Sequence, residues 1–204
     1  MSVRRPLDTG VERLKGIIGD MAAAAVEAFR RAMESVFTGK VALEDVRMLS
    51  EQLRFMREEA GQLAIELIAR FQPVATDLRR IRSCLQVSYD LSRIGRYSLD
   101  ICETSILVPV MGCDFSKLRQ LYIIVLYMVR EVGRAFIFED LDLAKKVREL
   151  GKPMLIAANK IDLPHAEENY KRLVEAYPNL VIIPTSAESE LALKKAQKMG
   201  LVDY

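Results

Sequence analysis

Apolar residues recur at helical spacing through roughly residues 10–150, and this periodicity limits the fold more than any other feature. Gly39 and Pro73 interrupt the pattern, and a further helix is predicted over about residues 74–104. The stripes are Leu14, Ile17, Met21, Ala25, Ala28 and Ala32; Leu53, Met56, Ala60, Leu63, Leu67 and Phe71; and Leu118, Leu121, Tyr122, Val125, Met128, Val129 and Val132. Four amphipathic helices of about 20–30 residues with short connections predict an antiparallel bundle.

The pattern changes after Leu150. Residues 154–158 and 180–183 are predicted as strands, and residues 167–176 and 188–199 as helices. This order is typical of a parallel sheet. The sequence therefore predicts a mainly α protein, with a helical bundle over residues 1–150 and a small β-α-β-α fragment over residues 151–204. Two strands form a marginal core with open edges, so this fragment requires a partner surface.

Composition excludes several classes of function. The chain has 204 residues, of which 50% are hydrophobic and 28% charged, as in ordinary soluble proteins. A net charge of +2 offers no electrostatic argument for nucleic-acid binding. Cys84, Cys102 and Cys113 lack any CxxC spacing, so neither a disulfide framework nor a zinc site is predicted. No apolar run follows Met1, and the longest one, residues 121–129, is too short to cross a bilayer. We expect a cytoplasmic protein without membrane insertion.

The run Asn159-Lys160-Ile161-Asp162 follows a predicted buried strand, and Thr185-Ser186-Ala187 begins 23 residues after Asp162. Two such loops at the ends of neighbouring strands are suited to reading guanine. The carboxylate of Asp162 accepts two hydrogen bonds from the base, and the stem of Lys160 covers the ring. Asn159 braces the loops, and the backbone N–H of Ala187, after Ser186, meets guanine O6.

The groups that hold nucleotide phosphates are missing from the sequence. No Gly-x-x-x-x-Gly-Lys-Ser/Thr loop occurs in the 204 residues. Most nucleotide affinity in GTPases comes from that loop and from magnesium. We therefore predict no GTP hydrolysis, at most weak guanine-nucleotide binding, and no catalytic residue. His165 and Ser186 have no partner in the sequence that would make either of them a nucleophile or a base.

The helical half resembles the PhoU family of phosphate-uptake regulators. The resemblance lies in LIARFQPVATDLRRI at residues 67–81 and YDLSRIGR at residues 89–96, and it extends over roughly residues 8–150. It implies one full three-helix repeat and the first helix of a second. It also implies a non-enzymatic regulator of phosphate uptake that forms a homodimer and acts through protein contacts, with the phosphate transporter ATPase or a sensor kinase as candidate partners.

At the positions of the metal-binding carboxylates in the PhoU family, this chain has side chains of a different charge. Many PhoU proteins bind metal clusters through pairs of carboxylates four residues apart, which share one helix face. At the corresponding positions this chain has Ser92 and Arg96, and, by an ungapped count back from Pro73, Ser50 and Arg54. A guanidinium repels a cation and cannot ligate it. We therefore predict no metal cluster in this bundle.

The arginine stripe, defined as Arg79, Arg82, Arg93 and Arg96, falls within an arc of about 100° on one helix. Guanidinium groups on one face are suited to phosphate or to an acidic partner. The alternative is an ordinary solvated face that Asp90 partly neutralises. The sequence leaves both interpretations open.

The end of the chain resembles archaeal Obg-like GTPases. The likeness is carried by GKPMLIAANKIDLP at residues 151–164 and covers about residues 145–204. Three hypotheses follow: a PhoU-like regulator, a guanine-nucleotide-binding module completed by another chain, and a fusion whose tail has no function. In the third, the crossover between the two sequences lies within residues 144–150. We favour the regulator as the function of the whole chain.

Overall fold

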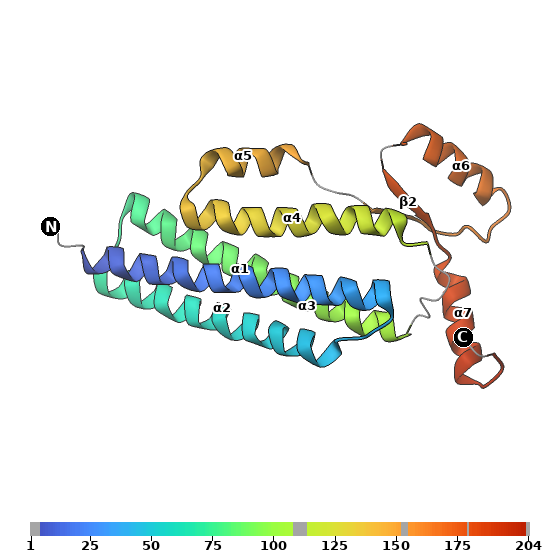
Figure 1. Ribbon diagram of the computed structural model, residues 1–204, viewed down its shortest axis with the longest axis horizontal. Helices are drawn as coiled ribbons and strands as arrows, with labels where there is room; N and C mark the ends of the chain where they lie inside the picture. The colour runs from blue at the N-terminus through green and yellow to red at the C-terminus, as the bar shows by residue number, and fades with distance from the viewer. Residues whose placement is uncertain (1–4, 108–113, 152–154, 179, 203–204) are drawn as a thin grey trace. The chain divides into compact units, whose positions relative to one another are not determined.

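The computed structural model describes residues 5–107, 114–151, 155–178 and 180–202 (Figure 1). The elements are α1 (Pro6–Thr38), α2 (Leu43–Phe71), α3 (Ala75–Leu107), α4 (Ser116–Phe138), α5 (Leu141–Glu149), β1 (Leu155–Ala158), α6 (Ala166–Ala176), β2 (Val181–Pro184) and α7 (Ala187–Lys198). Contacts divide the chain into two compact units, residues 1–151 and 152–204. The mainly α fold class, with a helical bundle and a small β-α-β-α fragment, is confirmed. Within the described ranges, no helix is both long and apolar enough to cross a membrane.

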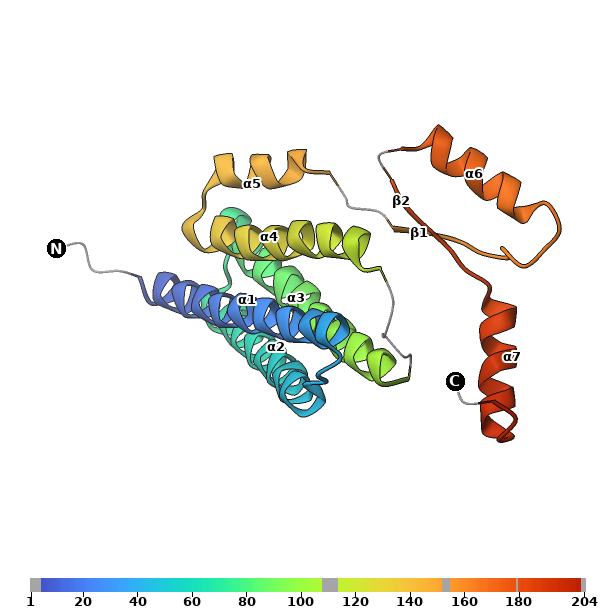
Figure 2. The same ribbon diagram turned by 45° about the vertical axis from the view of Figure 1, so that its right-hand side comes forward.

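Helix α1 is the centre of the bundle. It packs against α2, α3 and α4, and both views show it between α2 and α4 (Figures 1 and 2). Leu14, Ile18, Met21 and Ala25 of α1 have no exposed surface. The main core joins them to residues of α2 and α3, such as Leu53. The predicted stripe of α1 is therefore the surface on which the other helices assemble.

Short turns set the antiparallel order. Gly39 adopts φ 69° at the end of α1, and its N–H donates to the carbonyl of Ser35. The buried hydroxyl of Ser35 donates to the carbonyl of Arg31 at 2.9 Å and accepts the N–H of Ala42 at 3.0 Å. The Cys102 thiol of α3 lies 3.7 Å from the same hydroxyl. One serine thus ties the end of α1 to the start of α2 and to α3.

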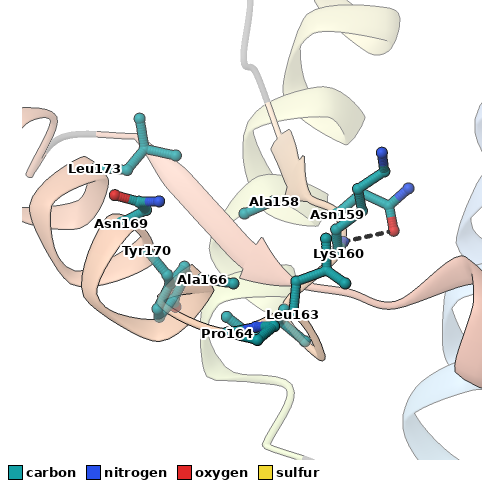
Figure 3. Close-up of a pocket in the computed structure, with 10 residues that line it drawn as sticks. Ala158, Asn159, Lys160, Leu163, Pro164, Ala166, Asn169, Tyr170 and Leu173 are labelled. Atoms are coloured by element: carbon teal, nitrogen blue, oxygen red, sulfur yellow. Dashed lines mark hydrogen bonds between the residues drawn. The ribbon is translucent and has the colours of Figure 1, made fainter.

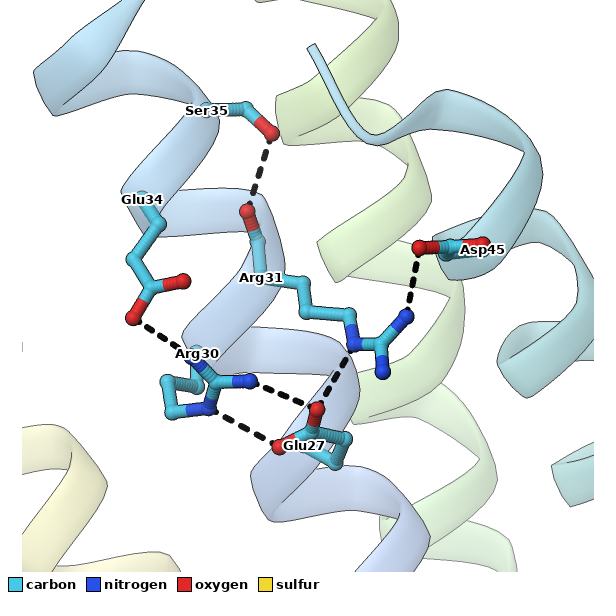
Figure 4. Close-up of polar contacts among 6 residues, drawn as sticks. All are labelled: Glu27, Arg30, Arg31, Glu34, Ser35 and Asp45. Carbon is cyan, nitrogen blue, oxygen red and sulfur yellow. Dashed lines mark hydrogen bonds and ion pairs between the residues drawn. The ribbon is translucent and has the colours of Figure 1, made fainter. Parts of the chain in front are cut away.

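An ion-pair network near the same turn links α1 to α2 (Figure 4). Both Arg30 and Arg31 donate to the carboxylate of Glu27, each at 2.6 Å in its shortest contact. Arg30 also pairs with Glu34, and Arg31 reaches Asp45 in the first turn of α2. Hydrogen bonds from the two guanidinium groups lower the pKa of Glu27 from 4.5 to about 2.

Helix α4 covers one side of the core instead of contributing to its centre. Its apolar stripe is half-buried from Leu118 to Val129, and Val132 is 45% exposed. The ring of Tyr122 contacts Phe29 and Phe37 of α1, with centroids 5.8 and 5.5 Å apart. Large apolar residues on α4 remain exposed: Ile123, Ile124, Tyr127 and Phe138. The four long helices are thus confirmed, with a core built mainly by α1, α2 and α3.

The second unit has a thin core. Strands β1 and β2 pair in parallel, with Ile156 opposite Ile182, and Ile182 is the one buried residue among those described in this unit. The hydroxyl of Tyr170 on α6 donates to the carbonyl of Ile182 at 3.3 Å. Other apolar side chains of the unit, Leu155 and Tyr177 among them, are exposed. Both strands follow their predicted positions, and Met154 of the first predicted strand lies outside the described residues.

The Glu27 network predicts an acid-sensitive bundle. Because the pKa of Glu27 is lower in the folded protein than its ordinary 4.5, the unfolded chain binds more protons between pH 4.5 and 2. The stability that this carboxylate contributes is present above pH 4.5 and is lost as the pH falls towards 2. Glu27→Gln should therefore lower the free energy of unfolding at pH 7 and flatten its decline below pH 4.5, as measured by urea unfolding followed by circular dichroism.

Glu66→Gln is the matched control, because Glu66 forms one exposed ion pair, with Arg70 at 2.8 Å. Exposed pairs contribute only about 0–1 kcal/mol. An acid profile that Glu27→Gln leaves unchanged would contradict this role of the network.

Candidate functional site

The two loops predicted to read guanine lie side by side because β1 and β2 run parallel and end at the same edge of the sheet. The N–H of Thr185 donates to the carbonyl of Ala158 at 2.9 Å, and the N–H of Ile161 donates to the carbonyl of Thr185 at 3.1 Å. The structure therefore places the Asn-Lys-x-Asp loop next to the Ser186-Ala187 loop.

Asn159 connects these loops through its side chain. Its Oδ1 accepts the backbone N–H of Lys160 at 2.9 Å, drawn in Figure 3, and the N–H of Ala187 at 3.0 Å. The N–H that the sequence assigns to guanine O6 is thus engaged by Asn159. Reading a base at Ala187 requires this hydrogen bond to open.

Asp162 is exposed, and its carboxyl group ionises readily. A hydrogen bond from the Ser186 side chain is the main cause that lowers the pKa of Asp162 below its ordinary value. Ser186 also caps α7, where its Oγ accepts the N–H of Ser189 at 3.2 Å. The acceptor that guanine N1 and N2 require is therefore ionised at neutral pH.

A hollow of about 460 Å³ lies beside this motif, between the end of β1 and α6 (Figure 3). Asn159 and Lys160 line it together with Pro164, Asn169 and Tyr170, among others. Asp162, Ser186 and Ala187 are not among its lining residues. The structure thus brings two of the five predicted residues into the hollow and leaves the main base-reading groups outside it.

The arginine stripe does not form one site. Arg79 and Arg96 are separated by about 25 Å along α3, at 1.5 Å per residue. Arg79 lines a hollow of about 520 Å³ among α1, α3, α4 and α5, whereas Arg93 and Arg96 line another, of about 290 Å³, between α2 and α3. Arg82 lines neither.

The larger of these two hollows has an apolar wall and paired charges. Lys15 contacts Glu139 at 3.0 Å, and Arg80 lies 3.9 Å from the same carboxylate. Cys84 reaches this hollow, and burial raises the pKa of its thiol to about 11. The thiol is therefore protonated at neutral pH and is no nucleophile.

The smaller hollow, called the arginine hollow below, brings together the two Ser-x-x-x-Arg pairs that the sequence identified. Ser50 and Arg54 come from α2, and Ser92 and Arg96 from α3. Arg57 also lines this hollow and was not predicted from the sequence, although it follows Arg54 at helical spacing on the same face. That spacing was the available signal. The remaining lining residues are Glu51, Glu58, Tyr89 and Arg93.

Close packing of the two helices creates this juxtaposition. Gly95 is buried between Ser92 and Arg96. A Cβ at this position would lie 2.5 Å from Cδ1 of Leu53 and 3.4 Å from Cα of Ser50. A hydrogen at Gly95 therefore lets the backbones of α2 and α3 approach beside the hollow.

The arginine hollow does not fit a cation cluster. It contains four guanidinium groups against two carboxylates, and an arginine offers no ligand atom to a metal. Across the described part of the chain, no three His, Cys, Asp or Glu side chains are grouped as metal ligands.

Two families match separate parts of the chain. Residues 18–105 match the PhoU domain, which corresponds to most of α1 and α3 and all of α2. Residues 157–204 match the G4 motif-containing domain of YGR210-like Obg-like GTPases, which includes the Asn159 and Ser186 loops. Both resemblances inferred from the sequence are confirmed.

The curated relatives divide in the same way. The chain is 32% identical over 139 residues to a PhoU homolog of the phosphate-specific transport system in Thermotoga maritima, covering 64% of this chain and 58% of that protein. It is 31% identical over 147 residues to the PhoU homolog of Aquifex aeolicus, covering 68% and 64%. It is 57% identical over 65 residues to a GTP-binding protein of Methanocaldococcus jannaschii, covering 31% and 16%. The chain therefore spans less than two thirds of the length of each of these relatives.

The glycine contact yields a prediction about the bundle. Gly95→Val should lower the free energy of unfolding by about 1–3 kcal/mol, because the added methyl groups overlap Leu53 and force α2 from α3. Urea unfolding measures this difference. Gly61→Val is the matched control, since a Cβ at Gly61 of α2 meets no heavy atom within 4 Å. Valine is a better helix former than glycine, so Gly61→Val should cost no stability, and equal losses in the two variants would contradict the contact with Leu53 as the cause.

Proposed function

We propose that this chain is a non-enzymatic accessory regulator of phosphate transport that acts through protein contacts. The observation that supports it most is the PhoU match over residues 18–105, because these residues contain most of the apolar core of the bundle. Two relatives matched over more than 60% of the chain are named as accessory proteins of the phosphate-specific transport system. The candidate partners are the ATPase subunit and the sensor kinase of such a system, both reached from the cytoplasm.

The exposed face of α4 is the surface that we assign to protein contact. Ile123, Ile124, Tyr127 and Phe138 fall within an arc of about 100° on this helix. Exposed apolar side chains gathered on one face favour association. A second copy presents the same face, and twofold pairing buries both. We therefore assign this face to a homodimer.

A second candidate function concerns the C-terminal unit. Ile182 is its one buried residue among those described, and β1 pairs on one edge with β2. A strand from another chain would bury more of this sheet and would complete a guanine-nucleotide-binding module. The match of residues 157–204 to a G4 motif-containing domain favours this candidate. The first candidate is preferred because the bundle needs no further strand to form its core.

Regulation and dimer formation are tested with one pair of substitutions. The chain should restore control of a phosphate-starvation reporter in a host lacking its own accessory protein, and it should form a dimer in light scattering. Ile123→Glu combined with Tyr127→Glu places two charges on the α4 face, and we expect monomers and loss of reporter control. Tyr177→Glu is the control, because this tyrosine is exposed in the other unit. A dimer that survives the double substitution contradicts the assigned face, and a folded chain without effect on the reporter contradicts the regulatory function.

Calorimetry tests whether the chain alone binds a guanine nucleotide. Titration of the chain with GDP should give a dissociation constant weaker than roughly 1 mM, unchanged by magnesium, because a single bidentate base contact does not offset the ordering that binding requires. Adenosine diphosphate serves as the control ligand. Submillimolar binding of GDP that depends on magnesium would show that the chain alone holds a nucleotide and would favour the nucleotide-binding module.

A further inference from the structure

Positive charge in the arginine hollow is only partly neutralised. Arg54 pairs with Glu58 at 2.8 Å. In the described ranges, Arg57, Arg93 and Arg96 have no carboxylate within 4.0 Å, and Asp90 acts on Arg93 only at longer range. Like charges held together on two helices repel one another unless an anion lies among them. The hollow therefore favours an anionic occupant.

Aromatic rings hold these guanidinium groups without neutralising them. The Arg93 guanidinium donates to the hydroxyl of Tyr97 and lies 5.8 Å from the ring centroid of Tyr89. The Arg57 guanidinium lies 5.8 Å from the same Tyr89 ring centroid, and that of Arg96 lies 5.4 Å from the ring centroid of Tyr97. Stacking on a ring orients a guanidinium and leaves its N–H groups available to a ligand.

The donors surround the hollow from two sides. Ser50 and Arg54 on α2 and Ser92 and Arg96 on α3 repeat the same pair of groups at the same spacing. Each guanidinium offers five N–H donors and each serine one O–H donor. A ligand with several acceptor oxygens directed to all sides matches this arrangement better than a planar carboxylate, which has two. Phosphate is the common ligand with that geometry.

The size of the hollow limits the ligand further. A volume of about 290 Å³ lies just below the range of small-molecule sites, about 300–1,000 Å³. It accommodates a phosphate ion with a few water molecules, or the phosphoryl end of a small monoester. Because the arginines are exposed, binding should weaken as salt concentration rises.

We propose that the arginine hollow is a binding site for a tetrahedral phosphate oxyanion, either free phosphate or the phosphoryl group of a small phosphomonoester. The site uses the positions at which the PhoU resemblance implies metal-binding carboxylates, with the sign of the charge reversed. It goes beyond the proposed regulatory function, which requires no ligand on the bundle. The two are tested by different measurements, so that either can fail alone.

The test is titration calorimetry of the full chain at low ionic strength, with inorganic phosphate in one arm and glycerol phosphate in the other. We expect saturable binding in at least one arm, weakened at least tenfold by Arg93→Gln combined with Arg96→Gln. Binding of phosphate identifies the free ion, and binding of glycerol phosphate alone identifies a monoester. Circular dichroism verifies that each variant retains its helices.

Arg13→Gln combined with Arg70→Gln is the matched control. It removes the same number of charges from exposed arginines of the bundle, which pair with Glu59 and Glu66 outside the hollow. This variant should bind within twofold of the original chain. An equal loss in both double variants would indicate general attraction to a positive surface and would overturn the proposal. Absence of saturable binding in both arms would overturn it as well.

Discussion

Burial of the apolar face of α1 is the interaction on which the rest of the structure depends. Leu14, Ile18 and Met21 are fully enclosed, and α2, α3 and α4 each contact this helix. Removing apolar surface from water contributes roughly 25 cal/mol per Å², so an apolar face buried from one end of a helix to the other stabilises the bundle directly. The polar contacts near its end, between Arg31 and Asp45 and around Ser35, select which helix lies where. The second unit has no comparable element, since Ile182 is its one buried residue among those described.

Sequence periodicity predicted the helices because each must bury an apolar face. Gly39 predicted the first turn because glycine accepts the left-handed backbone that ends a helix, and Gly39 adopts it. The periodicity did not predict how deeply α4 is buried. A stripe indicates which face is turned inward, but burial depends on how many neighbours cover that face, and α4 has α1 as its main neighbour in the bundle. The parallel strands were likewise predictable, since an apolar run on either side of a helix has few other arrangements.

The candidate sites were predicted less completely, for a related reason. Helical spacing gives the angle of a side chain around its own axis, and on that basis Arg79 and Arg96 share a face. Helical spacing contains no information about the adjacent helix. That helix, α2, supplies Arg54 and Arg57 to the arginine hollow, and it supplies no residue to the hollow that Arg79 lines. In the guanine motif, the loops were predicted from spacing. The brace by Asn159 was predicted as well, but not that it takes the N–H of Ala187, which the sequence assigned to guanine O6.

The two halves of the chain differ in how much of a working site each contains. The C-terminal unit has the groups predicted to read a base, without a phosphate loop, and Asp162 and Ala187 lie outside the nearby hollow. The bundle has a continuous core and an arginine hollow that Gly95 allows to form by bringing α2 close to α3. Selective binding depends on groups held by rigid elements. By that criterion the bundle is the half able to present a defined surface to a ligand or a partner, whereas the guanine motif records a relationship to GTPases. We therefore propose that the function resides in the helices, although the more familiar motif follows the strands.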